Sequence, residues 1–182
     1  MPCSDTKGIS CRKFISHGDG SLDLKKFSQL GTNVVFERGV RIFHPEHIKL
    51  GNNVYIGHRA YLKAYFKNKL MIGNNVWIGQ DAFLHAGGGI IIEDGVGIGP
   101  YVKIITLEHE EGERDIPVLY LDQKLAPVHI EYGVDIGIGS IILPGVTIGK
   151  NSLIGAGAVV TNNIPSYSVA VGVPARVIRT RS

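Results

Sequence analysis

Large aliphatic residues recur at every sixth position along most of the chain, and the residue two places before each of them is usually small or branched. Apolar, free, apolar alternation over three residues is the pattern of a strand, because successive side chains point to opposite faces. Each repeat therefore predicts one very short strand with inward ends and an outward middle. The aliphatic series is Leu50, Ile56, Leu62, Ile72, Ile78, Leu84, Ile92, Ile98, Ile104, Ile130, Ile136, Ile142, Ile148, Ile154 and Val160.

Turn-forming residues separate these short strands. Glycine makes up 24 of the 182 residues, well above the ordinary usage of about 7%. Pairs such as Asn52-Asn53 and Asp94-Gly95 lie between strands and tolerate the positive φ that a tight corner needs. An amphipathic helix is disfavoured, because apolar spacings of three and four are absent and each interior glycine would cost about 1 kcal/mol relative to alanine. A chain that turns after every six residues coils into a prism whose neighbouring coils pair as parallel sheets.

The six-residue period is interrupted at three places, and insertions are where a solenoid carries its function. From Leu50 to Ile72 the chain is four residues longer than three repeats, so we expect a bulge around residues 64–71. From Ile72 to Ile92 it is two residues longer, and residues 87–89, all glycine, accommodate the surplus. Between Ile104 and Ile130 about twenty surplus residues must leave the prism and return. A loop of that length in a compact domain is usually functional or disordered.

The repeat resembles that of the hexapeptide-repeat acyltransferases, in the galactoside and maltose O-acetyltransferase-like branch, over roughly residues 33–178. The resemblance implies an all-β fold: a left-handed parallel β-helix, three repeats per coil, with one long excursion loop. We expect an N-terminal cap over residues 1–32 and the β-helix domain over residues 33–182, with the loop at about 106–128 and a C-terminal tail.

Composition narrows the function classes. Apolar residues make up 44% of the chain and charged residues 19%, so it can bury a core, and a net charge of +3 argues against a dedicated nucleic-acid binder. Both cysteines, Cys3 and Cys11, lie near the N-terminus, which is no disulfide framework and suits a reducing compartment. No apolar run reaches the roughly 18 residues of a membrane span, and the first 30 residues lack the apolar centre of a secretory signal. We therefore expect a soluble, cytoplasmic protein.

His109 is the candidate catalytic residue. It lies five residues after Ile104, where the chain departs into the loop, and the resemblance implies a catalytic histidine at this place. Histidine is the natural general base near neutral pH. It would take a proton from an acceptor hydroxyl during attack on a thioester, and Glu108, Glu110 or a main-chain carbonyl could orient it.

The acceptor-binding prediction rests on three further residues. The resemblance implies a polar residue that contacts sugar at the corner of His85, with acids a few residues further on, which match Glu93 and Asp94. An ordinary surface histidine is an equally good interpretation of His85. The adjacent glycines would let the backbone approach a ligand.

The cofactor implied by the resemblance is acetyl-CoA, and no metal is expected. In the family the backbone near Ile138 supplies an amide for the oxyanion, and Ala156 and Thr161 line the pantetheine arm. Arg176 and Arg179 would approach the phosphates and adenine, which suits the bidentate guanidinium group. Two positions depart from the family pattern: Asn162 replaces a frequent lysine and Asp135 a common tryptophan.

Outward aromatic residues are expected to form one stripe on the prism, at Tyr55, Tyr61, Trp77 and Phe83, and Ile141, Leu153 and Val159 another. Apolar stripes on a monomer usually mark an interface, and the family is trimeric with active sites between subunits. A fold of the N-terminal cap over one stripe is the alternative.

The leading hypothesis is therefore an acetyl-CoA-dependent O-acetyltransferase acting on a hydroxyl of a saccharide or surface-polysaccharide precursor. The alternative within enzymes is an N-acyltransferase acting on an amino sugar of a nucleotide-sugar. A γ-type carbonic anhydrase shares the coil, but His85, His109 and His129 lack the spacing of its zinc ligands. A non-catalytic scaffold is the remaining class.

Overall fold

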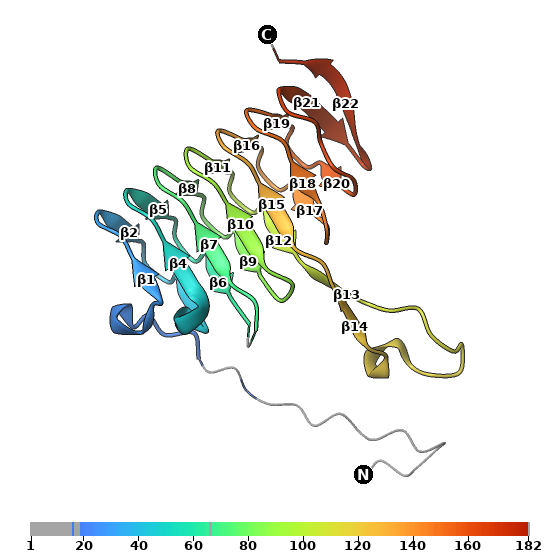
Figure 1. The fold of residues 1–182 in the computed structure, drawn as a ribbon, viewed down its shortest axis with the longest axis horizontal. Coiled ribbons are helices and arrows are strands. Elements are labelled where there is room, and N and C mark those ends of the chain that lie inside the picture. Colours follow the sequence, from blue (N-terminus) through green and yellow to red (C-terminus); the bar gives the residue numbers. More distant parts are fainter. Residues whose placement is uncertain (1–15, 17–18, 66, 182) are drawn as a thin grey trace.

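The computed structural model describes residue 16, residues 19–65 and residues 67–181. The chain winds into a parallel β-helix with three sheets along its sides (Figure 1). This confirms the predicted all-β class with hexapeptide repeats and one long excursion loop. Cys3 and Cys11 lie outside the described residues.

Sheet A forms the first side of each coil, and its neighbouring strands pair in parallel. Its strands are β1 (Gln29–Leu30), β4 (Ile48–Leu50), β7 (Leu70–Ile72), β10 (Ile90–Ile92), β15 (Val128–Ile130) and β18 (Thr147–Ile148).

Sheet B forms the second side and ends in an antiparallel pair. Its strands are β2 (Val34–Phe36), β5 (Val54–Ile56), β8 (Trp77–Ile78), β11 (Gly97–Ile98), β16 (Asp135–Ile136), β19 (Leu153–Ile154), β21 (Ser168–Gly172) and β22 (Ala175–Thr180).

Sheet C forms the third side, and the chain passes from its strands into the corner that carries all three insertions. Its strands are β3 (Arg41–Phe43), β6 (Tyr61–Lys63), β9 (Phe83–His85), β12 (Lys103–Ile105), β17 (Ile141–Ile142) and β20 (Val159–Val160).

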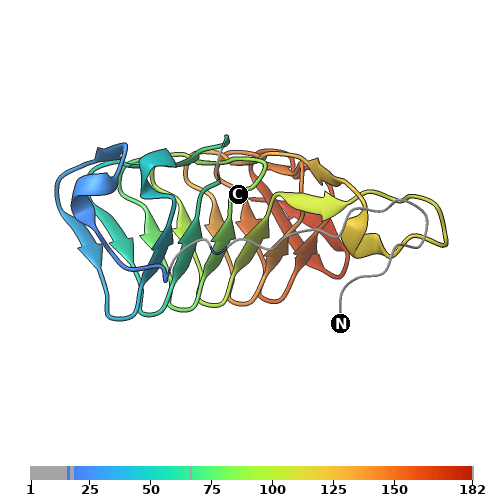
Figure 2. The same ribbon diagram turned by 90° about the horizontal axis from the view of Figure 1, so that it is seen from below.

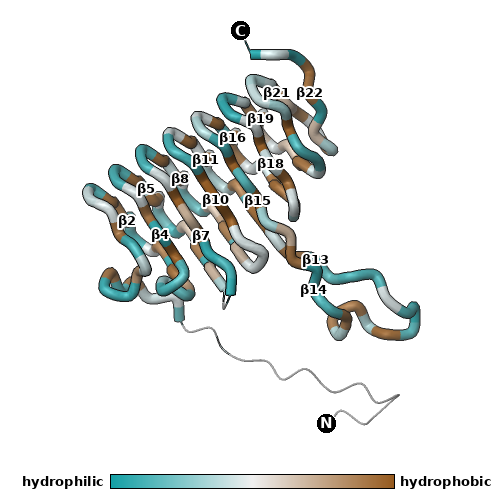
Figure 3. The backbone as a smooth tube through the Cα atoms, in the orientation of Figure 1, coloured by the Kyte–Doolittle hydropathy of each residue, from teal (hydrophilic) through white to brown (hydrophobic). Residues whose placement is uncertain are grey.

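The core confirms the six-residue period. All fifteen aliphatic positions of the repeat are buried, none more than 4% exposed. The small or branched positions that precede them are also buried, including the hydroxyl-bearing Ser140 and Ser152. Hydrophobic and hydrophilic segments consequently alternate along every coil (Figure 3). The apolar side chains meet on the axis of the prism, and this shared core holds the coils together.

Residues 24–30 of the N-terminal segment contact the first coils. A 3₁₀ turn, η1 (Leu24–Lys26), precedes Phe27, which packs against the core and lies 5.8 Å from the ring of Phe36. Strand β1 pairs with β4 through Leu30 and Leu50, so it already belongs to sheet A. The solenoid therefore begins before residue 33. A second 3₁₀ turn, η2 (Pro45–His47), lies at the corner before β4.

The outward aromatic residues do not form one stripe, contrary to the prediction. Tyr55 and Trp77 lie on sheet B, whereas Tyr61 and Phe83 lie on sheet C. The reason is geometric, because positions six residues apart occupy successive sides of the prism and only positions one coil apart stack. The second predicted stripe divides in the same way: Ile141 and Val159 pair on sheet C, and Leu153 lies on sheet B.

The C-terminal segment closes sheet B. Strand β21 pairs in parallel with β19, and β22 folds back antiparallel to β21. The turn between them contains the cis peptide bond Val173–Pro174. Among the described residues, no helix has the length and apolar character that crossing a membrane requires.

Candidate active site

The long insertion forms a hairpin that projects from the solenoid (Figures 1 and 2). Strands β13 (Leu107–His109) and β14 (Gln123–Leu125) pair antiparallel, and His109 lies opposite Gln123. The tip includes a 3₁₀ turn, η3 (Val118–Tyr120). His109 is thus the last residue of a regular strand, and the ladder holds its backbone in place.

The imidazole of His109 is oriented by the main chain. Its Nδ1 atom lies 3.3 Å from the carbonyl oxygen of Leu121. A carbonyl oxygen can only accept, so Nδ1 carries the proton and Nε2 of the neutral ring keeps its lone pair. Glu108, the neighbouring residue, faces Lys124 across the hairpin at 4.0 Å instead. Of the three groups that the sequence left open, the carbonyl oxygen is the one in contact.

Thr106 joins the root of this hairpin to the corner beyond His85. The Thr106 side chain is fully buried, its hydroxyl donates to the carbonyl oxygen of His85 at 2.8 Å, and it accepts from the N–H of Gly88 at 2.7 Å. A Cβ atom at Gly88 would collide with the carbonyl oxygen of Thr106. The close backbone approach at these glycines is therefore made by the hairpin root, where the sequence suggested a ligand.

The side chain of His85 lies in a row of aromatic rings on the outside of sheet C. Its ring centroid is 6.1 Å from that of Phe83 and 5.9 Å from that of Tyr65. Lys63 lies one coil earlier in register with His85, with its amine 5.4 Å from the centre of the Tyr65 ring. Partial burial lowers the pKa of the Lys63 amine. Aromatic rings beside a polar group such as the Lys63 amine can bind a small polar ligand that has an apolar side.

The three predicted acceptor residues do not form one cluster. His85 precedes the corner between sheets C and A, whereas Glu93 and Asp94 follow β10 at the next corner, between sheets A and B. Asp94 accepts hydrogen bonds from the backbone N–H and the side-chain amide of Asn74, at 2.7 and 3.0 Å. These bonds, the backbone one first, lower the pKa of the Asp94 carboxyl.

Glu93 is engaged by a histidine that the sequence analysis did not select. Oε1 of Glu93 lies 2.7 Å from Nε2 of His129, and Oε2 accepts from the N–H of Tyr132 at 2.9 Å. His129 stacks on Ile91 in the ladder, so Glu93 lies two residues beyond its partner position. The Glu93–His129 contact could be predicted from the sequence only if the number of residues in the hairpin excursion were known, because that number decides which residue of β15 pairs with Ile91.

The predicted cofactor residues Ile138 and Ala156 lie in stacked turns at the corner between sheets B and C. Gly157 donates its N–H to the carbonyl oxygen of Ile138 at 2.8 Å, which fixes the two turns to each other. Gly139 and Gly157 have positive φ, and a Cβ at either would meet no atom of the described residues within 4 Å apart from its chain neighbours. The corner therefore presents an open backbone ledge beside Ile138 and Ala156.

The remaining predicted cofactor residues lie on or near the last coil. Thr161 follows β20 and accepts from the amide of Asn162 at 2.9 Å. Arg176 and Arg179 are exposed on β22, opposite Val171 and Val169. No hydrogen bond or ion pair within the described parts of the chain joins His109 to any of the predicted cofactor residues.

His85, His109 and His129 occupy separate environments. Across residues 19–65 and 67–181, no three histidine, cysteine or acidic side chains are grouped in a way that could hold a metal ion.

Comparisons with known proteins agree with this architecture. The family described as bacterial transferase hexapeptide (six repeats) matches residues 127–162. A point mutant of AntD, an N-acyltransferase from Bacillus cereus, is 31% identical with a TM-score of 0.77, and the match covers 87% of each chain. The chain belongs to the hexapeptide-repeat acyltransferase family. That AntD structure is described as a complex with dTDP-4-amino-4,6-dideoxyglucose and coenzyme A.

Other members of the hexapeptide-repeat acyltransferase family act on sugars by name. Galactoside O-acetyltransferase from Escherichia coli is 35% identical over 161 residues, which cover 87% of this chain and 66% of that protein. A maltose O-acetyltransferase from Clostridium difficile is 31% identical, with a TM-score of 0.59, over 87% of this chain and 72% of the other. The chain spans 42% and 60% of the length of the curated relatives that it matches from two yeasts, Schizosaccharomyces pombe and Saccharomyces cerevisiae.

Proposed function

We propose that this protein is an acetyl-CoA-dependent O-acetyltransferase that moves an acetyl group to a hydroxyl of a saccharide or surface-polysaccharide precursor. The observation that carries the proposal is the contact between Nδ1 of His109 and the carbonyl oxygen of Leu121, at 3.3 Å. It orients the ring with Nδ1 toward the carbonyl oxygen, so that Nε2 is the nitrogen that can take a proton from an acceptor.

In the proposed reaction, Nε2 of His109 removes the proton of the acceptor hydroxyl as that oxygen attacks the thioester carbonyl carbon. The new carbon–oxygen bond gives a tetrahedral oxyanion, for which a backbone N–H at the corner of Ile138 is the candidate donor. Collapse of this intermediate breaks the carbon–sulfur bond, and the imidazolium returns its proton to the departing thiolate. Positioned proton transfer of this kind contributes about 10²–10⁴ in rate.

The ledge beside Ile138 and Ala156 supports the placement of acetyl-CoA. The turns there leave space of at least 4 Å between a Cβ at Gly139 or Gly157 and the other described residues, chain neighbours aside. Arg176 and Arg179 extend from β22 into solvent and can pair with phosphates. We assign the pantetheine arm to the ledge and the phosphate groups to the arginines.

The assembly proposed for the active enzyme is a homotrimer with active sites between subunits. Its support is the separation of the two halves of the site: His109 is on the hairpin that leaves from sheet C, whereas the ledge lies at the corner between sheets B and C. The half-buried rings on the outside of sheet C, where Tyr61 and Phe83 stack at 4.8 Å, supply apolar surface for such an interface.

A second candidate function is N-acylation of an amino sugar carried by a nucleotide. It is supported by the likeness to AntD, whose TM-score of 0.77 exceeds the 0.59 of the maltose O-acetyltransferase. The two reactions share the donor ledge and the base, and differ in the acceptor nucleophile.

One experiment tests both functions. Purified protein is incubated with acetyl-CoA and either a galactoside, a maltose derivative or a dTDP-amino sugar, and thiol release is followed alongside product mass. O-acetylated sugar that depends on His109 supports the first proposal. If only the amino sugar is acetylated, the second proposal replaces the first. If no thiol is released with any of the three acceptors, both proposals are contradicted.

A further inference from the structure

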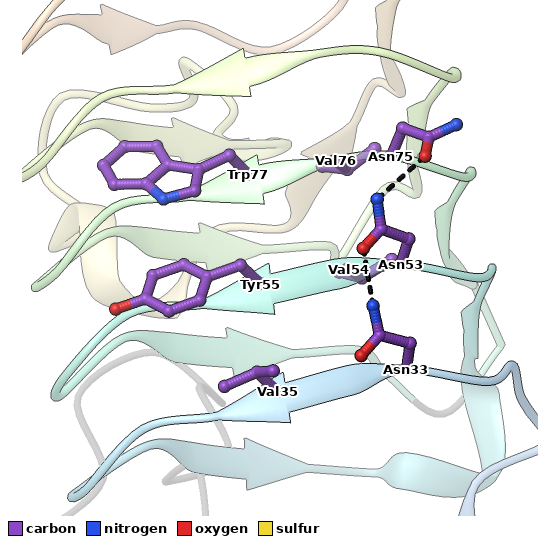
Figure 4. Close-up of a pocket in the computed structure, with 8 residues that line it drawn as sticks. All are labelled: Asn33, Val35, Asn53, Val54, Tyr55, Asn75, Val76 and Trp77. Carbon is purple, nitrogen blue, oxygen red and sulfur yellow. Dashed lines mark hydrogen bonds between the residues drawn. The ribbon is translucent and has the colours of Figure 1, made fainter.

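A shallow groove lies on the outer face of sheet B, in the first three coils and away from the hairpin (Figure 4). It has a volume of about 290 Å³, at the lower end of the range for small-molecule sites. No step of the proposed acetyl transfer uses it. Eight residues line it: Asn33, Val35, Asn53, Val54, Tyr55, Asn75, Val76 and Trp77.

One side of the groove is a flat aromatic platform. The rings of Tyr55 and Trp77 are parallel to within 3°, with centroids 5.9 Å apart, and Figure 4 shows them side by side on the sheet. Trp77 is 43% exposed, and Val35, which lies on the other side of Tyr55 in the same row, is 42% exposed. An exposed row of this kind leaves a large apolar surface in water, which usually marks a binding site.

The opposite side of the groove is a ladder of three amides. The Nδ2 group of Asn33 donates to Oδ1 of Asn53 at 2.7 Å, and Nδ2 of Asn53 donates to Oδ1 of Asn75 at 2.9 Å. All three residues have positive φ, which asparagine tolerates at the corner. An amide has two N–H donors and an oxygen with two lone pairs. Among the described residues, the Asn53 amide bonds only to its two neighbours in the ladder, which leaves its second N–H and its second lone pair for a ligand.

One carboxylate lies beyond the Trp77 end of the platform, and a second lies near the hydroxyl of Tyr55. At Gly97, the position next to Trp77 on the same face, a Cβ would be 2.6 Å from Oδ1 of Asp135. The Asp135 carboxylate thus lies over the bare backbone where the aromatic row stops. Near the hydroxyl of Tyr55, the Glu37 carboxylate is paired with His58 at 3.3 Å, and desolvation and then this carboxylate raise the pKa of the hydroxyl. The Asp135 carboxylate can accept hydrogen bonds from hydroxyl groups.

The eight lining residues carry no formal charge and the charged groups beside them are carboxylates, so the groove does not match a phosphate. A pyranose has one face of C–H groups that can pack on the electron-rich face of an aromatic ring. Its rim of hydroxyl groups both donates and accepts, which matches the amides. A protein surface seated here would instead have to satisfy a row of three amides or leave them unpaired.

We propose that this groove is a saccharide-binding site, separate from the acetyl-transfer site, with pyranose rings stacked on Tyr55 and Trp77 and hydroxyls bonded to the asparagine ladder. The site holds a sugar chain without acting on it. The proposal does not require the acetyltransferase assignment, because it rests on sheet B alone.

Trp77 is the single tryptophan of the chain, so intrinsic fluorescence reports directly on this groove. Maltotriose, lactose and chitotriose are titrated into the full-length protein without acetyl-CoA, with calorimetry in parallel. We expect a saturable change in emission with at least one of them. Tyr55→Ala should weaken binding about tenfold, since it removes one stacking ring, and Tyr55→Phe should retain it.

The amide ladder is tested by Asn53→Gly, which removes the side chain while keeping a residue that accepts positive φ. It should also weaken binding, whereas Tyr132→Ala, at an exposed tyrosine between sheets A and B, should not. Circular dichroism confirms that each variant is folded. The proposal is overturned if none of the three saccharides binds, or if binding is indifferent to both substitutions. The proposal is also overturned if, without saccharide, the wavelength of maximum emission shifts with protein concentration in step with the molecular mass of the assembly. That result would make the groove an interface between copies.

Discussion

The hydroxyl of Thr106 holds the root of the long hairpin against the corner that follows His85, donating to the His85 carbonyl oxygen at 2.8 Å. Because Gly88 donates to the same hydroxyl at 2.7 Å, the substitution Thr106→Val leaves two partly buried backbone groups without this partner. We expect a loss of about 1–3 kcal/mol in the free energy of unfolding, measured by urea denaturation. Thr147→Val, on the outer face of sheet A, should change it by less than about 0.5 kcal/mol. Equal losses in both variants would contradict a special role for Thr106.

His109→Ala removes the proposed general base. We expect kcat to fall by about 10²–10⁴, with little change in KM for acetyl-CoA. Thiol release measured at saturating acceptor checks this. His58→Ala, an exposed histidine paired with Glu37 at 3.3 Å, is the matched control and should leave kcat unchanged. A His109→Ala enzyme with full activity would remove the mechanism.

The proposed pantetheine ledge is tested by two glycines with the same backbone conformation. Gly139 and Gly95 both have a φ of +71°, but only Gly139 lies beside Ile138. Alanine at either position costs about 1–2 kcal/mol because of the left-handed backbone. Gly139→Ala should in addition raise KM for acetyl-CoA several-fold, since its methyl group would stand on the ledge. If KM rises equally in Gly95→Ala, the effect comes from backbone strain and the ledge assignment fails.

Arg176 and Arg179 are predicted to bind the phosphates of coenzyme A. Alanine at either should raise KM for acetyl-CoA about tenfold or more, because a hydrogen bond to a charged group contributes about 1.5–3 kcal/mol. The turnover number should hold, since neither residue touches the reacting carbon. Steady-state kinetics at low and high salt measure both effects. Arg38→Ala, on an exposed turn of the first coil, provides the comparison; no change in KM for either tail variant would place the phosphates elsewhere.

Asp94 is predicted to act on stability rather than on the acceptor. The hydrogen bonds from Asn74 lower the pKa of the Asp94 carboxyl. The ionised carboxylate therefore stabilises the folded state at pH values above its ordinary pKa of 3.8. That contribution disappears as the pH falls through the lower value of the folded protein. Thermal unfolding of wild type and Asp94→Asn between about pH 6 and about pH 3 should show a gap in melting temperature that narrows toward acid. A gap that stays constant with pH would refute the assignment.

The repeat could be predicted from the sequence because the same six-residue pattern recurs in each coil. Ile136 and Ile154, eighteen residues apart, are interchangeable members of one ladder, and both are buried. The excursion followed from the same count, since twenty surplus residues have to leave the prism, whereas the choice of His109 at its start came from the resemblance to the family. Each repeat has to bury an aliphatic side chain in the core, so an aliphatic residue is found in every repeat.

Contacts between coils were harder to predict. The sequence suggested that Glu93 and His85 share a site, but Glu93 bonds to His129 across the whole hairpin. Tyr55 and Tyr61 were grouped although six residues place them on different sides of the prism. Such pairings depend on which side a position occupies and on how many residues each insertion adds. Neither quantity is visible in composition or in the aliphatic period.

The return of β22 along β21 has a consequence for how molecules of this protein meet end to end. A parallel ladder has no built-in length, and its last strand offers an unpaired edge on which a further molecule could continue the stack. Here the final edge of sheet B runs in the opposite direction to every rung before it. A neighbouring molecule whose strands run parallel to these coils would therefore meet an edge that does not continue the parallel pattern of sheet B.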